Sequence, residues 1–466
     1  MKNILLYVIA FGVCIGISEK SQAAIKLPSF FCDNMILQQK TETTIWGWSK
    51  INATVHIKTS WNNKSYTIRS NSQGKWQTNI STPPAGGPYH IDISDGEKLT
   101  LNNVLIGEVW ICAGQSNMEM PMYGYGNQPV NHSLDAIVKS QNSHIRLFTV
   151  EREYASVPLD DCRGKWLEAT PENVSAFSAT AYFFGRLVNQ VTDIPIGLIV
   201  VSWGGSSIKA WVGEENLKPF GDKVIPHKED MENPKQSPAA LYNGMLHPFF
   251  CYAIRGAIWY QGESDISRAS QYGNYMETMV KDWRTQWKQG DFPFYYAQIA
   301  PYNNNSVHNS AYLREAQLDA MKTIPNSGMI VLMDSHSPDC IHPPKKQEAG
   351  ERFAYWALSE TYQIKGIPYK SPAVQNINFE NGRAIVTFAN ARGGLTSYGK
   401  EIKSVQLSGD NNRWYPATVV LDENKMYAFS AKVPQPVAIR YAFTDYAESE
   451  IFGNQGLPVS SFRSNK

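Results

Sequence analysis

The sequence predicts an α/β protein in which a doubly wound parallel sheet is flanked by small N-terminal and C-terminal β-sandwich domains. Apolar and polar side chains alternate with period two in residues 25–105, and the same pattern returns in residues 371–466. Between them, in residues 106–370, short apolar runs alternate with helical patterns. Because 466 residues are too many for one hydrophobic core, we expect these three segments to be separate domains.

The first 24 residues have the pattern of a secretory signal peptide. Lys2 precedes an apolar run over residues 4–17, and small residues follow at Ser21-Gln22-Ala23-Ala24. A basic start, an apolar centre and a small-residue exit describe a cleavable signal, and the run is too short for a comfortable membrane span. We therefore expect a secreted or periplasmic protein with no membrane span.

The charge balance and the cysteine content narrow the functional classes. A formal net charge of +1 without a long basic run argues against a nucleic-acid partner. The cysteines beyond residue 24 form an odd, scattered set rather than a disulfide framework, although export would permit a bridge. Neither Cys-x-x-Cys nor His-x-x-x-His spacing occurs, so the sequence predicts no metal and no other cofactor.

Both flanking segments predict antiparallel β domains. In residues 25–105, strand-like runs such as that of Val55 and Ile57 are separated by Asn, Gly and Pro clusters, which is typical of a small sandwich. We expect this domain to brace its neighbour rather than to bind sugars. Beyond about residue 372, Glu380-Asn381-Gly382 lies between two alternating runs and predicts a hairpin.

The central segment alternates strands with helices. The predicted buried strands cover residues 109–113, 196–201, 257–260, 294–299 and 329–333, and the predicted helices cover 177–191, 272–287, 312–323 and 347–362. This alternation specifies a parallel sheet with helices on both faces. Residues 123–139 are polar and contain Gly and Asn, so we expect a loop beside the site.

Four polar segments follow predicted strands of the central sheet. They are Gly114-Gln115-Ser116-Asn117-Met118, Trp203-Gly204-Gly205-Ser206-Ser207, Gln261-Gly262-Glu263-Ser264-Asp265 and Asp339-Cys340-Ile341-His342-Pro343. Open α/β sheets bind their ligands at the carboxyl ends of the strands. We therefore expect the four segments to meet at one edge.

The side chains in these segments are the ones that acyl transfer requires. Ser116 can supply the nucleophilic hydroxyl and His342 can take its proton. Asp339, three residues before the histidine, can bond the other imidazole nitrogen. The backbone N–H groups of Ser116 and Gly205, with the side-chain amide of Gln261, can face the oxyanion.

Each segment also has a purely structural interpretation. Ser116 and its neighbours are common helix caps, and Asp339 three residues before His342 also occurs as a capping arrangement. Gln261 can simply satisfy buried backbone groups. Glu263 competes with Asp339 as the carboxylate that orients the histidine, and we favour Asp339 because its proximity in sequence fixes its geometry.

Taken together and in order, the four segments resemble the motifs of sialate O-acetylesterases, which are relatives of the SGNH hydrolases and of acetyl xylan esterases. The resemblance includes Gly107-Glu108-Val109-Trp110 before the serine, Ile208-Lys209-Ala210-Trp211 after the second segment, Trp259-Tyr260 before the third, and Gly350-Glu351-Arg352 after the histidine. It extends from about residue 25 to the end of the chain.

This resemblance implies an SGNH-like esterase domain with the roles just described. Ser116 is then the nucleophile, His342 the base and Asp339 its partner, while Ser116, Gly205 and Gln261 form the oxyanion hole. SGNH enzymes commonly have Asn in the third block, where this sequence has Gln261.

The sequence therefore predicts a secreted serine esterase that removes O-acetyl groups from sialic acid or related acetylated glycans through an acetyl-enzyme. Two alternatives stay open, an acetyl xylan esterase acting on plant polysaccharide and a non-catalytic carbohydrate-binding protein. A glycosidase that uses Glu108 or Glu263 would need two carboxylates across one cleft, and the sequence shows no clear pair.

Overall fold

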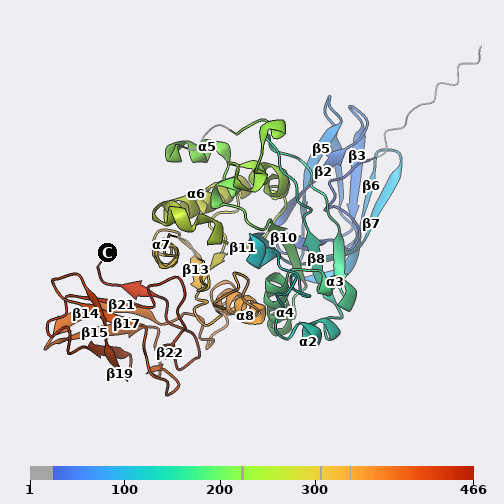
Figure 1. Ribbon diagram of the computed structural model, residues 1–466. Helices are drawn as coiled ribbons and strands as arrows, with labels where there is room; N and C mark the ends of the chain where they lie inside the picture. The colour runs from blue at the N-terminus through green and yellow to red at the C-terminus, as the bar shows by residue number, and fades with distance from the viewer. Residues whose placement is uncertain (1–24, 222–224, 305–306, 336, 466) are drawn as a thin grey trace, which may run out of the picture.

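The structure is a computed structural model that describes residues 25–221, 225–304, 307–335 and 337–465 (Figure 1). The signal peptide predicted at residues 1–24 lies outside the described residues. The described chain forms an N-terminal group of strands, a central α/β region and a C-terminal group of strands, which follow one another across the molecule in Figure 1.

The central region contains the predicted parallel sheet. Its strand order is β13 (Ser327–Ile330), β12 (Phe294–Ala297), β11 (Gly256–Tyr260), β7 (Lys98–Gly114), β10 (Ile196–Ser202), β8 (Asn142–Thr149) and β9 (Trp166–Ala169). Every neighbouring pair is parallel except β8 and β9, which are antiparallel at the edge. The five predicted strands are confirmed, and β8 and β9 are additional to them.

Strand β7 connects two sheets. It is 17 residues long, and its first part pairs antiparallel with β6 (Gly86–Ser94) of the N-terminal group. Its last part lies between β10 and β11 in the parallel sheet. The boundary expected between residues 105 and 106 therefore falls inside one continuous strand.

Helices cover both faces of the parallel sheet, as predicted (Figure 1). They are α4 (Ala179–Thr192) and α8 (Lys346–Trp356) on one face, and α6 (Ala269–Trp287) and α7 (Ala311–Ala320) on the other. Successive side chains of a strand point to opposite faces, so Trp110 of β7 packs with α4 and α8 while Ile111 packs with α6 and α7. Each face therefore has its own core.

The flanking groups are antiparallel, with β1 as the exception. The N-terminal group contains β1 (Ile36–Gln38), β2 (Glu42–Trp48), β3 (Thr54–Thr59), β4 (Ser65–Arg69), β5 (Lys75–Ser81) and β6, of which β1 pairs parallel with β7. The C-terminal group has two four-stranded sheets, β14 (Ala373–Glu380), β15 (Arg383–Ala389), β20 (Lys425–Phe429) and β19 (Thr418–Asp422), and β18 (Trp414–Pro416), β17 (Val405–Ser408), β21 (Ala438–Tyr441) and β23 (Phe462–Arg463). The predicted hairpin is confirmed, because Glu380 pairs with Arg383 across Asn381-Gly382.

Buried Arg314 joins the C-terminal group to α7. Its guanidinium donates to the Ser461 hydroxyl at 3.1 Å and to the carbonyls of Asp445 at 3.3 Å and of Thr444. Desolvation lowers the pKa of Arg314 to about 10. One side chain thus supplies several of the hydrogen bonds at this junction.

Candidate active site

Ser116 lies in a tight turn at the end of β7. Gly114 has a φ of +143°, and a Cβ atom at that position would lie 2.2 Å from the carbonyl oxygen of Tyr260. Only glycine fits such a backbone conformation and such a close approach. The next residue, Gln115, donates its N–H to the same Tyr260 carbonyl at 3.0 Å, and Ser116 then begins the short helix α1 (Ser116–Glu119).

The first three polar segments meet at one edge of the sheet. Gly114 is in register with Ser202 of β10 on one side and with Tyr260 of β11 on the other. The chain leaves β7 for β8 and β10 on one side and then crosses to β11 on the other. Ser116 therefore follows the strand at which the strand order reverses, where ligands bind in open α/β sheets.

The second segment packs directly against the serine. Gly204 donates its N–H to Glu119 Oε2 at 2.8 Å, and a Cβ atom on Gly204 would lie 3.3 Å from the Cβ of Ser116. Among the described residues, no acceptor is recorded for the N–H of Ser116 or of Gly205. Both N–H groups are thus available as donors. The first N–H groups of a helix have no partner within the helix, and N–H groups in a glycine turn can also point at an anion.

His342 lies close to the serine turn in a half-buried loop. Asn117, the residue after Ser116, donates through Nδ2 to the carbonyl of Ile341 at 3.1 Å. The imidazole Nδ1 lies 2.5 Å from Gln128 Oε1, and the Tyr125 ring packs edge-on with its centroid 5.1 Å away. The described contacts include no hydrogen bond between the Ser116 hydroxyl and the imidazole.

The surroundings of His342 keep its imidazole neutral. Burial, and then the positive charge of Lys346, lower the pKa of His342 to about 4. A neutral imidazole can accept a proton from a hydroxyl, whereas an imidazolium cannot.

The structure does not bring the Asp339 carboxylate to His342. Asp339 is exposed, and the recorded partner of the imidazole Nδ1 is Gln128. A spacing of three residues fixes how far two side chains can reach but not which neighbour the imidazole meets. Gln128 comes from the segment 123–139, which the sequence predicts to be a loop beside the site. That prediction is wrong for part of the segment, because Ser133–Val138 form the helix α2. Only the polarity of the segment indicated Gln128. The role of Asp339 stays a prediction.

Gln261 and Glu263 both have structural partners. Gln261 Nε2 donates to the Ser206 carbonyl at 3.0 Å and to Asp265 Oδ2 at 2.6 Å, so neither of its N–H groups is left for an oxyanion in this arrangement. Glu263 Oε1 accepts from Asn117 Nδ2 at 2.6 Å, and the described contacts do not join it to the histidine. Their catalytic roles likewise stay predictions.

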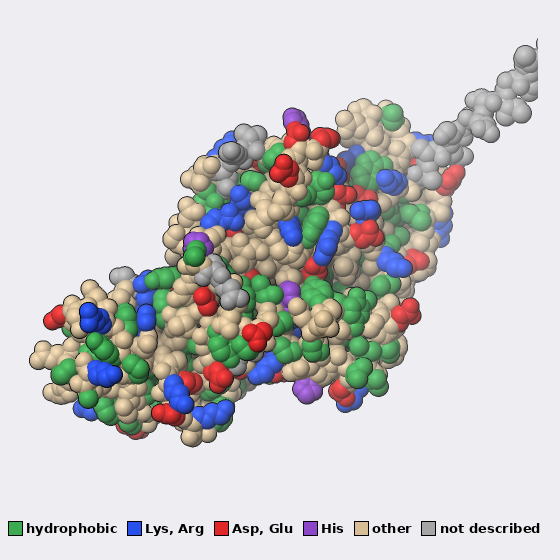
Figure 2. Space-filling view, in the orientation of Figure 1, with side chains coloured by type: hydrophobic (Ala, Val, Ile, Leu, Met, Phe, Trp, Pro, Cys, Tyr) green, Lys and Arg blue, Asp and Glu red, His purple; other side chains and the backbone are tan. Residues whose placement is uncertain are grey.

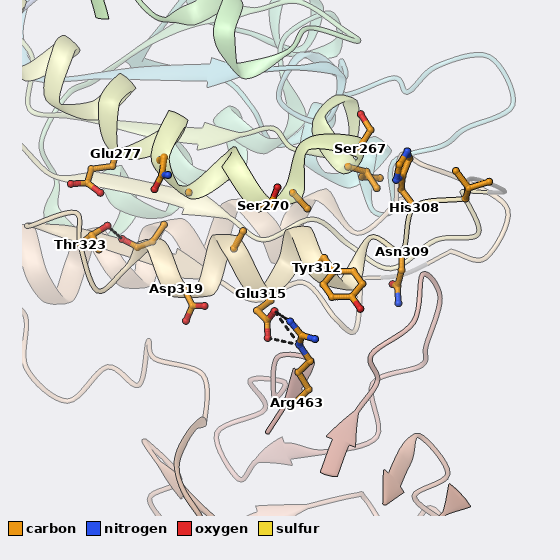
Figure 3. Close-up of a pocket in the computed structure, with 17 residues that line it drawn as sticks. Ser267, Ser270, Glu277, His308, Asn309, Tyr312, Glu315, Asp319, Thr323 and Arg463 are labelled. Atoms are coloured by element: carbon orange, nitrogen blue, oxygen red, sulfur yellow. Dashed lines mark hydrogen bonds and ion pairs between the residues drawn. The ribbon is translucent and has the colours of Figure 1, made fainter. Parts of the chain in front are cut away.

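A groove of about 570 Å³ lies between α6 and α7 (Figure 3). Tyr312 and Asn309 line it, and the ion pair of Arg463 with Glu315, 2.9 Å long, lies at one side. None of the six predicted site residues lines this groove. The groove is therefore separate from the sheet edge at which the sequence predicts the catalytic residues.

Several other properties of the described residues bear on function. No three His, Cys, Asp or Glu side chains among them come together as a metal site would require. Within the described ranges, every helix is too short or too polar to cross a bilayer. Figure 2 shows acidic and basic side chains interspersed over the visible face, without the single-sign patch that nucleic-acid binding uses.

Comparisons with known proteins show what the chain as a whole is similar to. A family model described as carbohydrate esterase, sialic acid-specific acetylesterase, matches residues 106–359. The sialate O-acetylesterase of Pongo abelii is 27% identical over 488 residues, which cover 94% of this chain and 92% of that protein. The Homo sapiens sialate O-acetylesterase is 26% identical over the same shares. A crystal structure of a carbohydrate acetylesterase from Xanthomonas citri superposes with a TM-score of 0.87 at 29% identity, over 95% of this chain and 100% of that one.

Proposed function

We propose that this chain, which belongs to the carbohydrate esterase family of sialic acid-specific acetylesterases, removes O-acetyl groups from sialic acid or a related acetylated glycan through an acetyl-enzyme. The observation that carries this proposal is the serine turn. Ser116 follows the strand at which the strand order reverses, and the free N–H groups of Ser116 and Gly205 lie at that edge.

The proposed reaction has two steps. The Ser116 hydroxyl attacks the acetyl carbonyl while His342 takes its proton, and the N–H groups of Ser116 and Gly205 stabilise the oxyanion. The bond to the sugar oxygen then breaks, and the sugar leaves with the proton from His342. Water attacks the acetyl-serine with His342 again as the base, which releases acetate and restores the hydroxyl.

In this proposal Asp339 orients the imidazole during the reaction. That role requires Asp339 to replace Gln128 at Nδ1, since one imidazole N–H donates to one acceptor at a time. Backbone donors alone would complete the oxyanion hole, unless the Gln261 amide exchanges its present partners for the substrate.

A nearby cation favours an anionic sugar over xylan. A Cβ atom on Gly205 would lie 3.0 Å from Lys235 Nζ, so this ammonium lies against the second segment. The described residues include no carboxylate paired with it. The carboxylate of a sialic acid can pair with such a cation, whereas neutral acetylated xylan offers no charge.

Replacing Ser116 with alanine tests the proposal. Ser116→Ala should lower the rate of p-nitrophenyl acetate hydrolysis by about 10⁴-fold or more, with an unchanged circular dichroism spectrum. Ser267→Ala is the matched control, because this serine is exposed on η7 (Glu263–Arg268) and should be dispensable. A Ser116→Ala variant that keeps a tenth of the wild-type rate would refute the assignment.

The substrate is tested by acetate release from O-acetylated sialic acid and from acetylated xylan, side by side. We expect release from the sialic acid ester. Release from xylan alone would favour the xylan esterase alternative. Glycan binding without any release of acetate would favour the carbohydrate-binding alternative.

A further inference from the structure

A buried polar cluster lies directly behind the serine turn. It contains Asn117 of α1, Glu263 of η7, Lys346 at the start of α8 and the ring of Tyr260 at the end of β11. Asn117 is 0% exposed, Lys346 is 1% exposed and Glu263 is 9% exposed. Four separate elements of the chain therefore meet in one water-poor site.

Asn117 uses its whole side-chain amide in this cluster. Nδ2 donates to Glu263 Oε1 at 2.6 Å and to the Ile341 carbonyl at 3.1 Å, and Oδ1 accepts from Lys346 Nζ at 2.5 Å. An asparagine amide has two N–H donors, and both are used here. This one side chain ties the turn that carries Ser116 to the loop that carries His342.

A lysine at position 346 is energetically unfavourable in this buried cluster. Burying an ammonium costs free energy unless it is paired and hydrogen-bonded, and burial lowers the pKa of Lys346 to about 7 although the Glu263 carboxylate opposes that shift. Burial in turn raises the pKa of Glu263, whose Oε2 has no recorded partner. An apolar side chain would fill the same space without the free-energy cost of burying a charge. Packing alone therefore does not account for the lysine.

The charge of Lys346 also acts on the histidine. Its titratable neighbours are Glu263, the Cys340 thiol, the phenol of Tyr260 and the imidazole of His342. After burial, Lys346 is the second cause that lowers the pKa of His342. The ammonium thus acts on the Ser116 turn through its hydrogen bond to Asn117, and on His342 through its positive charge.

We propose that Lys346 is a positioning residue: through Asn117 it holds the Ser116 turn against the His342 loop, and its charge adds to burial in disfavouring the protonated imidazole. This role presupposes the esterase function proposed above. Under this proposal, the first residue of α8 supports acetyl transfer in addition to its place in the packing of the helix.

Lys346→Met is the test, with Lys345→Met as the matched control. Lys345 is the sequence neighbour, and its ammonium donates to the Asp334 carbonyl at 2.8 Å, outside the cluster. Lys346→Met should lower kcat by about 10-fold to 100-fold, because small displacements of reacting groups are costly, while KM stays within about twofold. Lys345→Met should behave as wild type.

The second measurement is the pKa of His342, followed by nuclear magnetic resonance of the imidazole without substrate. Removal of the neighbouring charge should raise this pKa by about half a unit or more, and the acid limb of kcat/KM should move upward with it. If Lys346→Met does not fold, Lys346→Gln removes the charge but keeps an N–H for Asn117 Oδ1, and the same rise is expected.

The outcomes separate this inference from the proposed function. A wild-type protein without esterase activity would overturn the proposed function. An active Lys346→Met variant with wild-type kcat and an unmoved His342 pKa would overturn the positioning role alone. The positioning role would also be overturned if Lys346→Met and Lys345→Met lowered kcat by the same factor.

Discussion

At the scale of single residues, His342 determines how the proposed reaction depends on pH. Its imidazole is half-buried between Tyr125 and Gln128 and lies in the field of Lys346. Both burial and the neighbouring charge disfavour the protonated form. A base with these surroundings stays active in acid where an exposed histidine does not.

This predicts the acid limb of the pH profile. Since the pKa of His342 lies at about 4, kcat/KM for p-nitrophenyl acetate should hold its plateau down to about pH 5 and fall as pH drops through about 4. Protonation removes the base, so the loss lies on the acid side. An acid limb near the ordinary histidine pKa of about 6.5 would contradict the buried imidazole described here.

Some residues of the site could be predicted from the sequence and others could not. Ser116 and Gly205 follow recognisable strands, and parallel strands bring their carboxyl ends together. The contact of Lys346 with Asn117 joins residues 229 positions apart, and no local pattern encodes such a pair. Gln261 shows a second reason why the sequence is insufficient. A glutamine amide can donate either to an oxyanion or to a buried carbonyl, and the residue type alone does not say which one it meets.

At the scale of secondary structure elements, the turn after β7 controls the site. Strands β10 and β11 fix Gly114 from both sides, and the Tyr260 carbonyl occupies the space where a side chain would start. The position of Ser116 therefore depends on a close contact between two backbones.

Gly114→Ala should disturb this element. The positive φ and the overlap with Tyr260 should lower the stability by about 2 kcal/mol or more, and esterase activity should fall as Ser116 moves. Thermal unfolding of the variant measures the first effect. The control is Gly126→Ala, because a Cβ atom there would meet no other atom within 4 Å. Equal melting temperatures for the two variants would contradict the contact.

The helices could be predicted because their apolar patterns are long and periodic, and the central strands because each coincides with a short, almost uninterrupted apolar run. Strand β8 could not, because it starts with polar residues and turns a charged side chain inward. Arg146 is 1% exposed and forms an ion pair of 2.9 Å with Glu168 of β9. A buried, paired charge breaks the apolar pattern that reveals a strand.

At the scale of the whole molecule, the two flanking groups are attached in different ways. The N-terminal group shares β7 with the central sheet, whereas the C-terminal group packs on α7 through side chains such as Arg314. The carbonyls that Arg314 satisfies would be left without donors if it were removed, which costs free energy in a buried junction.

Arg314→Met should therefore loosen the C-terminal group. We expect faster cleavage by proteases between α8 and β14 and a melting temperature lower by several degrees, in keeping with a loss of about 2 kcal/mol. Arg413→Met, at an exposed arginine of the same group, should change neither. Identical protease patterns for the two variants would show that Arg314 does not hold the junction.

The continuity of β7 has a consequence for anyone who wishes to trim the protein. A fragment that begins at residue 106 would start partway along its own middle strand and would lack the partner that pairs with the strand's first half. The smallest autonomous catalytic unit should thus retain the leading β region. In thermal or mechanical unfolding, these two regions should give way as a single cooperative block.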